Sequence, residues 1–281
     1  MATTTQLPGS SGPALRSAPS GRAGFTGALR SEFTKIRSVR STYWTLITLV
    51  VVTIGIGTLA CVGAVSHGSG IRGPGFDATQ RSLAGLILGQ LIIVVLGALT
   101  VTSEYSTGMI RTSLTVQPRR GTLLAAKGVI FFLVSLVTGL VASFVSFFIG
   151  QAILSSKHLG VSLGDPNVLR AVVGGALFLA VCGMLAFGLG TLLRHTAGAI
   201  TASIGLLFVL FVLINFLPSS WQNHVDKWIP FNAGSQVWTT VNQPGTHLFS
   251  AWTGFAVFLG YAVIAIIDRK SSCRERVLLP V

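Results

Sequence analysis

The sequence predicts an all-α integral membrane protein with six transmembrane helices and both termini in the cytoplasm. First, 51% of the 281 residues are hydrophobic and only 10% are charged, whereas soluble domains carry about 25% charged residues. Too few polar side chains remain to cover such a chain in water. Second, the apolar residues form six long runs. Third, Lys and Arg are concentrated in alternate connections between these runs, as in multi-pass proteins.

Each of the six runs is long enough to be a transmembrane helix, which needs about 20 apolar residues. The third run exceeds this length, so its first turns are expected to project into the cytoplasm. Only Arg194, His195 and Thr196 separate the fourth run from the fifth, which predicts a tight turn at the membrane face. The runs are approximately Tyr43–Val65, Ser82–Thr102, Leu123–Leu154, Val168–Leu193, Ala197–Leu217 and Leu248–Ile267.

The distribution of cations predicts the orientation. Fifteen of the 20 Lys and Arg residues lie before the first run, between the second and third, between the fourth and fifth, or after the sixth, when Lys127 in the first turns of the third run is counted with the connection before it. Because cytoplasmic loops are enriched in Lys and Arg, both termini are expected inside. The net charge of +13 is explained by these loops. No basic stripe with interleaved aromatics is present, so nucleic acid is not an expected partner.

The domain organisation follows from composition. Residues 1–24 are rich in Ser, Thr, Pro, Gly and Ala; we expect a disordered cytoplasmic tail rather than a signal peptide. In residues 25–42, Leu29, Phe33 and Ile36 recur at helical spacing among cations, which predicts an amphipathic helix in the cytoplasmic interface. Residues 43–270 are expected to form the six-helix transmembrane domain, and residues 271–281 a cytoplasmic tail.

The longest outer connection runs from Pro218 to His247. Its apolar residues have helical spacing before Pro230 and Pro244 break the chain. We predict short re-entrant extracellular helices between spans 5 and 6; an ordinary extracellular loop is the alternative. Four tryptophans are expected to form an outer aromatic belt: Trp221, Trp228, Trp238 and Trp252.

The spans contain no Asp, Glu, Lys, Arg or His in their central parts. Ion-coupled transporters need buried ionisable groups there, so energy for any uphill transport must come from elsewhere. The three cysteines are scattered, which predicts neither a disulfide framework nor a metal site. No phosphate-binding loop of the G-x-x-x-x-G-K-[ST] type occurs. We therefore expect no catalytic residues and no cofactor bound by this chain.

A few small and polar residues stand out inside the spans. Gln90 is the most interior polar residue, and it either faces a cavity or makes an interhelical hydrogen bond. Gly183, Ala186, Gly188 and Gly190 in the fourth run are expected to allow close approach of neighbouring helices.

The loop between the second and third spans has the most specific pattern. Glu104 and Tyr105 stand where the second span reaches the cytoplasm, an amphipathic stretch follows, and Pro118 ends it. A short helix that connects two membrane helices is suited to transmit a movement of a soluble partner protein to both of them. We expect Glu104 to pair with a cation at this boundary.

This pattern resembles that of ABC-2-type permeases, the membrane subunits of bacterial ATP-binding-cassette exporters. The segment Ser31–Arg37 also resembles the S-E-[FW]-x-K-[IL]-R that precedes their first span, and the resemblance extends from about Gly27 to Lys270. Met109 departs from the commoner Thr. The residues that match the loop pattern are Glu104, Tyr105, Gly108, Met109, Ile110, Arg111, Pro118, Arg120 and Lys127.

The resemblance implies a location in the bacterial inner membrane and a cytoplasmic ATPase partner that carries ATP and Mg. It also implies a second permease copy, identical or paralogous, and export of an apolar or amphipathic compound such as a drug, lipid or peptide antibiotic. The implied ATPase contacts are Glu104, Tyr105, Gly108, Met109, Ile110 and Arg111, with Arg194 and His195 as a smaller second contact. The implied substrate pathway is lined by Gln90, Phe208, Phe211 and Asn215.

Two other functions remain open at this point. One is a membrane anchor or sensor that recruits a partner without transport. The other is a passive channel, which the absence of a charged or carbonyl-lined filter disfavours.

Overall fold

A computed structural model of the chain describes residues 25–66, 75–106, 120–216, 218–241 and 248–267. The described part contains helices and no strand. Its long elements are α1 (Phe25–Ser38), α2 (Arg40–Ser66), α4 (Leu86–Ser106), α6 (Arg120–Ser155), α7 (Val168–Leu193), α8 (Thr196–Ile204) and α12 (Ala251–Ile267). The shorter ones are α3 (Ala78–Ser82), the π-helical η1 (Gly205–Val209), α9 (Leu210–Leu213), η2 (Ile214–Phe216), α10 (Ser219–Val225), η3 (Asp226–Trp228), α11 (Pro230–Ser235) and η4 (Gln236–Trp238).

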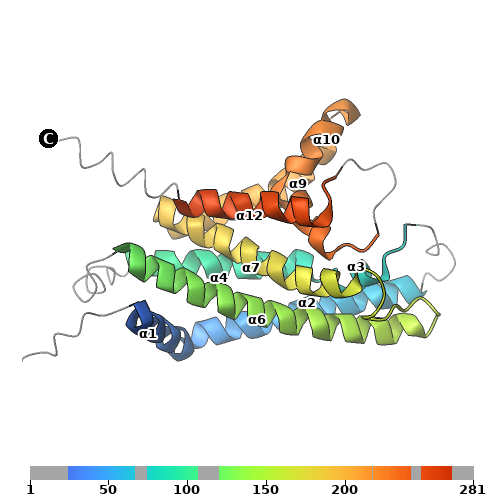
Figure 1. Ribbon diagram of the computed structural model, residues 1–281, viewed down its shortest axis with the longest axis horizontal. Helices are drawn as coiled ribbons and strands as arrows, with labels where there is room; N and C mark the ends of the chain where they lie inside the picture. The colour runs from blue at the N-terminus through green and yellow to red at the C-terminus, as the bar shows by residue number, and fades with distance from the viewer. Residues whose placement is uncertain (1–24, 67–74, 107–119, 217, 242–247, 268–281) are drawn as a thin grey trace, which may run out of the picture.

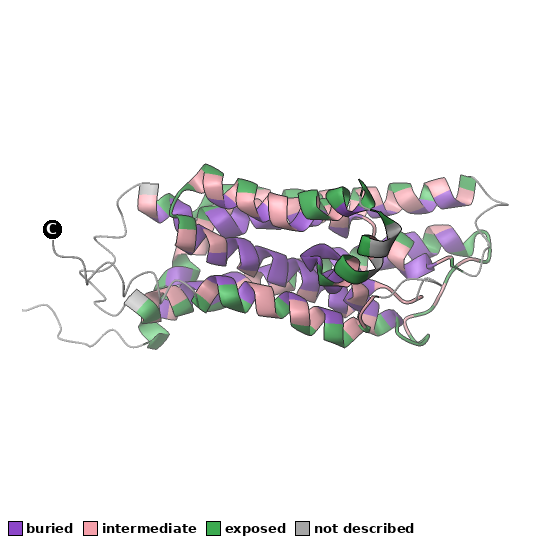
Figure 2. Ribbon diagram, turned by 90° about the horizontal axis from the view of Figure 1, so that it is seen from above, coloured by how far each residue is buried: buried purple, intermediate pink, exposed green. Residues whose placement is uncertain are grey.

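The long helices lie side by side in an elongated bundle (Figure 1). The central helix is α7, which packs against α4, α6 and α12. Most of its residues are buried, and Figure 2 shows the buried positions gathered on the inward sides of the bundle. A helix surrounded by other helices must be apolar on every face, as α7 is.

Five helical stretches are long and apolar enough to cross a membrane: Arg40–Ser66, Leu86–Tyr105, Gly121–Ser155, Val168–Leu193 and Thr196–Phe216. They match the first five predicted runs and make this a multi-pass membrane protein. The sixth run appears as the apolar helix α12, which has 17 residues in the described part. Helix α6, which contains the third predicted run, has 36 residues and is longer than a span requires, as predicted.

Small residues allow the central helices to approach closely. A Cβ atom added to Gly97 on α4 would collide with the carbonyl oxygen of Gly183 on α7, and one on Gly188 would lie 2.9 Å from the Cβ of Ala265 on α12. The close approach predicted for the glycines of the fourth run is therefore present. Because lipid gives helices no hydrophobic reason to associate, such tight backbone packing is a main source of their cohesion.

The predicted N-terminal amphipathic helix is present, but it ends earlier than residue 42. Helix α1 stops at Ser38, and α2 begins at Arg40 instead of Tyr43. Val39 interrupts the helix between them, and the Thr42 amide donates to the Val39 carbonyl at 3.2 Å. This break turns α1 onto α6, against which it packs.

The connection between the fifth and sixth runs, predicted to lie outside, forms two short α-helices in its described part, α10 and α11, each continued by a 3₁₀ turn. Pro230 is the first residue of α11, where its missing N–H costs nothing. All of α11 is buried, packed against α12. The prediction for Trp238 was wrong, because its side chain is only 2% exposed. The ring centroids of Trp238 and Phe178 are 6.3 Å apart. The other three predicted belt tryptophans are exposed. Because α11 turns inward, the residues of η4 enter the core.

Candidate coupling site and substrate path

Four charged side chains meet where α1, α4 and α6 come together. Lys127 Nζ lies 2.7 Å from Glu104 Oε1 and 3.0 Å from Glu32 Oε2. Lys35 forms a further ion pair with Glu104. Helix α1 supplies Glu32 and Lys35, the end of α4 supplies Glu104, and the start of α6 supplies Lys127. We call these four residues the junction cluster.

The junction cluster is largely shielded from solvent. The side chains of Lys127, Glu32 and Glu104 are 5%, 8% and 9% exposed, whereas Lys35 is 34% exposed. Burying a charge is tolerable only when it is paired and hydrogen-bonded. Two acids and two bases meet that condition with no net charge. Lys127 alone contacts both carboxylates, so it is the residue on which the other buried charges depend.

The predicted cation partner of Glu104 is thus present, and it is Lys127 together with Lys35. The sequence pattern did not reveal that Glu32 joins them. A usable signal existed, because Glu32 is one of seven acids in the chain and stands beside cations in the segment Ser31–Arg37. Pairing it with Lys127, 95 positions away, required the packing of α1 on α6.

A second contact joins the two loops that sequence reasoning assigned to ATPase contact. The guanidinium carbon of Arg194 lies over the Tyr105 ring, 5.9 Å from its centroid, within the range of a cation–π interaction. The predicted tight turn is confirmed: α7 ends at Leu193, Arg194 adopts a left-handed conformation, and α8 begins at Thr196. His195 caps α8 by accepting the Gly198 amide at Nδ1, 3.2 Å away.

The start of α6 and the end of α7 lie at the same end of the bundle as α1 (Figure 1). The junction cluster and the Tyr105–Arg194 contact therefore share one end of the molecule. Four of the predicted contact residues, Gly108, Met109, Ile110 and Arg111, lie in residues 107–119, outside the described part. The short helix predicted there stays a prediction.

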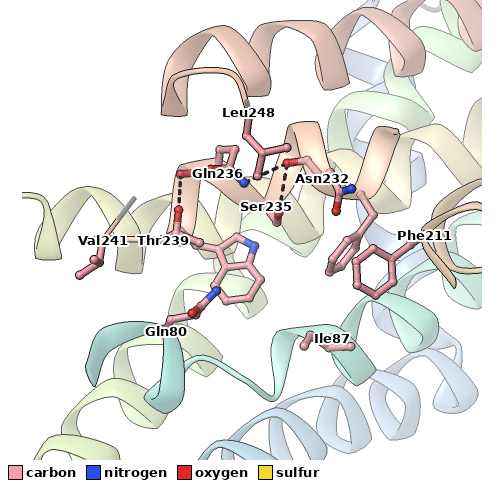
Figure 3. A pocket seen from close by; sticks show the side chains of 11 residues that line it. Gln80, Ile87, Phe211, Asn232, Ser235, Gln236, Thr239, Val241 and Leu248 are labelled. Atoms are coloured by element: carbon pink, nitrogen blue, oxygen red, sulfur yellow. Dashed lines mark hydrogen bonds between the residues drawn. The ribbon is translucent and has the colours of Figure 1, made fainter. Parts of the chain in front are cut away.

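Near the other end, a cavity of about 350 Å³ lies between α3, α4, α9 and the α11–η4 segment. Phe211 forms part of its wall and packs on Phe231, with ring centroids 4.5 Å apart. Figure 3 shows Phe211 and Ile87 on the apolar side of the cavity, facing the polar residues of α11 and η4. We call this the outer cavity. Its wall is formed by Gln80, Ile87, Phe211, Phe231, Asn232, Ser235, Gln236, Trp238, Thr239, Val241 and Leu248.

The polar side of the outer cavity is held by local hydrogen bonds, drawn in Figure 3. Ser235 Oγ and Gln236 Nε2 both donate to the Asn232 carbonyl, at 3.1 and 3.3 Å. Thr239 Oγ1 donates to the Gln236 carbonyl at 3.1 Å. In the described part of the chain, no ionisable side chain lines this cavity. Amide and hydroxyl groups beside aromatic rings suit an uncharged or amphipathic molecule.

A pair of ionisable residues anchors the segment that closes the outer cavity. Asp77 Oδ2 accepts the amides of Thr240 and Val241 at 2.6 and 3.0 Å. Arg170 Nη2 donates to the Thr239 carbonyl at 2.7 Å. Asp77 is only 4% exposed. Sequence reasoning missed this role, because backbone acceptors and donors more than sixty residues away leave no local pattern.

The other residues predicted for the substrate path lie elsewhere. Gln90 is fully buried on α4, with Cys182 Sγ on α7 4.0 Å from its Oε1, while its Nε2 has no hydrogen-bond partner in the described part; its role stays a prediction. Phe208 is half-buried in η1 and outside the cavity wall. Asn215 is exposed and donates from Nδ2 to the Phe211 carbonyl at 3.0 Å. Of the four, the structure brings only Phe211 to the outer cavity.

A family model described as ABC-2 family transporter protein matches residues 28–213, which is more than half of the chain. The matched region includes the junction cluster, the Tyr105–Arg194 contact and Phe211. No curated protein matches the chain.

Proposed function

The chain belongs to the ABC-2 family of transporter proteins, and on this premise we propose that it is the membrane permease of an exporter driven by a separate cytoplasmic ATPase. In this proposal α12 is the sixth transmembrane span, both termini are cytoplasmic, and α10 and α11 dip into the outer leaflet. The proposed location of the permease is the inner membrane of a bacterial cell. Two permease copies, identical or paralogous, enclose the path, and ATP with Mg binds to the partner.

The junction cluster is the observation that carries the coupling proposal. It joins α1, α4 and α6 at the two ends of residues 107–119, the segment proposed to contact the ATPase. A partner can shift the conformational equilibrium of the permease only through contacts that differ between its states. A motion of this segment would act on three helices together, because buried ion pairs resist separation. The neighbouring Arg194–Tyr105 contact would bring the α7–α8 turn into the same unit.

The proposed substrate is an uncharged or amphipathic compound such as a drug, lipid or peptide antibiotic. The uncharged, partly aromatic wall of the outer cavity supports this class. The exposed apolar residues of α9, which include Leu210 and Leu213, support a second permease copy at this helix. Since Phe211 is on the same helix, the outer cavity would then open beside the path between the two copies.

Copurification tests the proposal. The full chain, expressed in its native host and purified, should bring down an ATP-binding-cassette ATPase, and reconstitution of both should raise ATP hydrolysis above that of the ATPase alone. A membrane anchor or sensor would bind a partner without stimulating hydrolysis. Purification without any ATPase, or binding with unchanged hydrolysis, would contradict the permease proposal.

A further inference from the structure

We propose that the groove between α1 and the transmembrane helices holds the acyl chains of an anionic glycerophospholipid from the cytoplasmic leaflet, whose headgroup is bound by Arg30 and Arg37. This inference concerns a resident lipid, not the transported compound. It requires neither ATP hydrolysis nor transport.

The groove consists of two adjoining cavities beside α1. One, of about 260 Å³, lies between α1, α2, α4 and α6; the other, of about 270 Å³, lies between α1, α2 and α6. Ile36, Thr42 and Val134 line both. The two cavities adjoin at these three residues. Together they match the shape of a lipid with two acyl chains.

Three junction residues line the first cavity at one side, and the rest of the groove wall combines apolar side chains with hydroxyl groups of Ser and Thr. Leu99 and Phe131 line the first cavity, and Phe33 and Leu46 line the second. Phe33 is 52% exposed, although it belongs to a helix with charged neighbours. A soluble anion would leave this surface in contact with water, whereas an acyl chain would cover it. The apolar part of the wall therefore favours a lipid over free phosphate.

The charge around the groove is positive where a headgroup would lie. The acids of the junction cluster are occupied by Lys127 and Lys35. Arg30 and Arg37 are exposed, and neither has an acidic partner within the described residues. They are seven positions apart, so they lie on one face two turns apart, with Phe33 between them. Arg37 lines the second cavity, and Arg30 follows on the same face of α1 outside both cavities, so the two cations can bind a phosphodiester above acyl chains from one side.

Native mass spectrometry of the purified full chain tests the proposal. The probes are dioleoylphosphatidylglycerol and dioleoylphosphatidylcholine, which have the same chains and differ in net charge. We expect the anionic lipid to bind more tightly. Arg30→Gln and Arg37→Gln should each weaken it about fivefold, the effect of one cation near an anionic surface. Both changes should leave the zwitterionic lipid unaffected.

Two further variants separate the groove from general surface charge. Val134 lines both cavities, so the larger side chain of Val134→Trp should occupy part of the groove and lower the binding of both lipids. Arg81→Gln removes an exposed cation from α3, at the other end of the bundle, and should change nothing. Equal binding of the two lipids, full binding by the arginine variants or by Val134→Trp, or an equal loss in Arg81→Gln would overturn the proposal. The arginine variants alter exposed side chains, so they remain informative if Val134→Trp misfolds.

Discussion

Lys127 Nζ lies 2.7 Å from Glu104 Oε1, and this single ion pair joins the first turns of α6 to the last turn of α4. Residues 107–119 connect these two helices, so the ion pair ties together the helix before this segment and the helix after it. Lys127 also reaches Glu32 on α1. A displacement of the segment is therefore expected to move three helix ends as one body instead of bending a single helix.

The first prediction concerns stability. Lys127→Met leaves the carboxylates of Glu32 and Glu104 buried without their shared partner, and breaking a buried pair in this way costs about 3–5 kcal/mol. Lys35→Met is the matched control, because its side chain is partly exposed and Glu104 keeps Lys127; we expect about 0–1 kcal/mol. Thermal unfolding of both variants in the same detergent measures the difference. Equal midpoints for the two variants would contradict this account of the junction cluster.

The second prediction concerns coupling. Glu104→Gln keeps the size of the side chain but removes the charge that holds Lys35 and Lys127. We expect the complex with the ATPase to assemble, while transport and substrate-stimulated ATP hydrolysis fall severalfold. Asp165→Asn, an exposed acid between α6 and α7, is the control and should behave as wild type. Unchanged stimulation in Glu104→Gln would remove the junction cluster from the coupling path.

Sequence reasoning predicted local features well and long-range ones poorly. The tight turn at Arg194 and His195 was predictable because charges interrupted two apolar runs. The pairing of Glu104 was predictable because it is the only acid in a stretch that continues with Arg111, Arg119, Arg120 and Lys127. The join between Glu32 and Lys127, and the Asp77 contacts to residues 240 and 241, depend on how distant segments pack. Trp238 was misplaced for the same reason, since hydropathy does not reveal that α11 turns into the core.

The third prediction concerns topology. In a background with Cys273→Ser, single cysteines at Ser66 and Ser162 should react with a membrane-impermeant thiol reagent in intact cells, because both lie at the end of the bundle away from α1. A cysteine at Ser38 should react only after the cells are lysed. Cys61 and Cys182 are buried and should add little background. Labelling at Ser38 in intact cells would reverse the proposed orientation.

The fourth prediction concerns the packing of α4 on α7. Gly97→Ala places a Cβ against the Gly183 carbonyl, and overpacking of this kind costs about 1–3 kcal/mol. Gly55→Ala makes the same change on α2, where nothing lies within 4 Å of the added atom. This control should be neutral or slightly stabilising, because alanine favours helix more than glycine does. Gly97→Ala unfolding at the wild-type temperature would show that the two helices can separate at little cost.

The fifth prediction separates two aromatic residues that sequence reasoning treated as equivalent. Phe211 lines the outer cavity and contacts Phe231, whereas Phe208 lies three residues earlier, outside the cavity wall. Phe211→Leu removes aromatic surface from the cavity while keeping an apolar side chain, so the loss of stability should be about 1–2 kcal/mol, from the lost ring volume and the lost contact with Phe231. Phe208→Leu makes the identical change outside the cavity.

We expect Phe211→Leu to shift the relative export of several uncharged aromatic compounds, with assembly and basal ATP hydrolysis retained. Phe208→Leu should keep the parental profile. A changed profile in Phe208→Leu together with a parental profile in Phe211→Leu would place the path beside Phe208 and outside the outer cavity. Parental profiles in both would assign the two rings to packing.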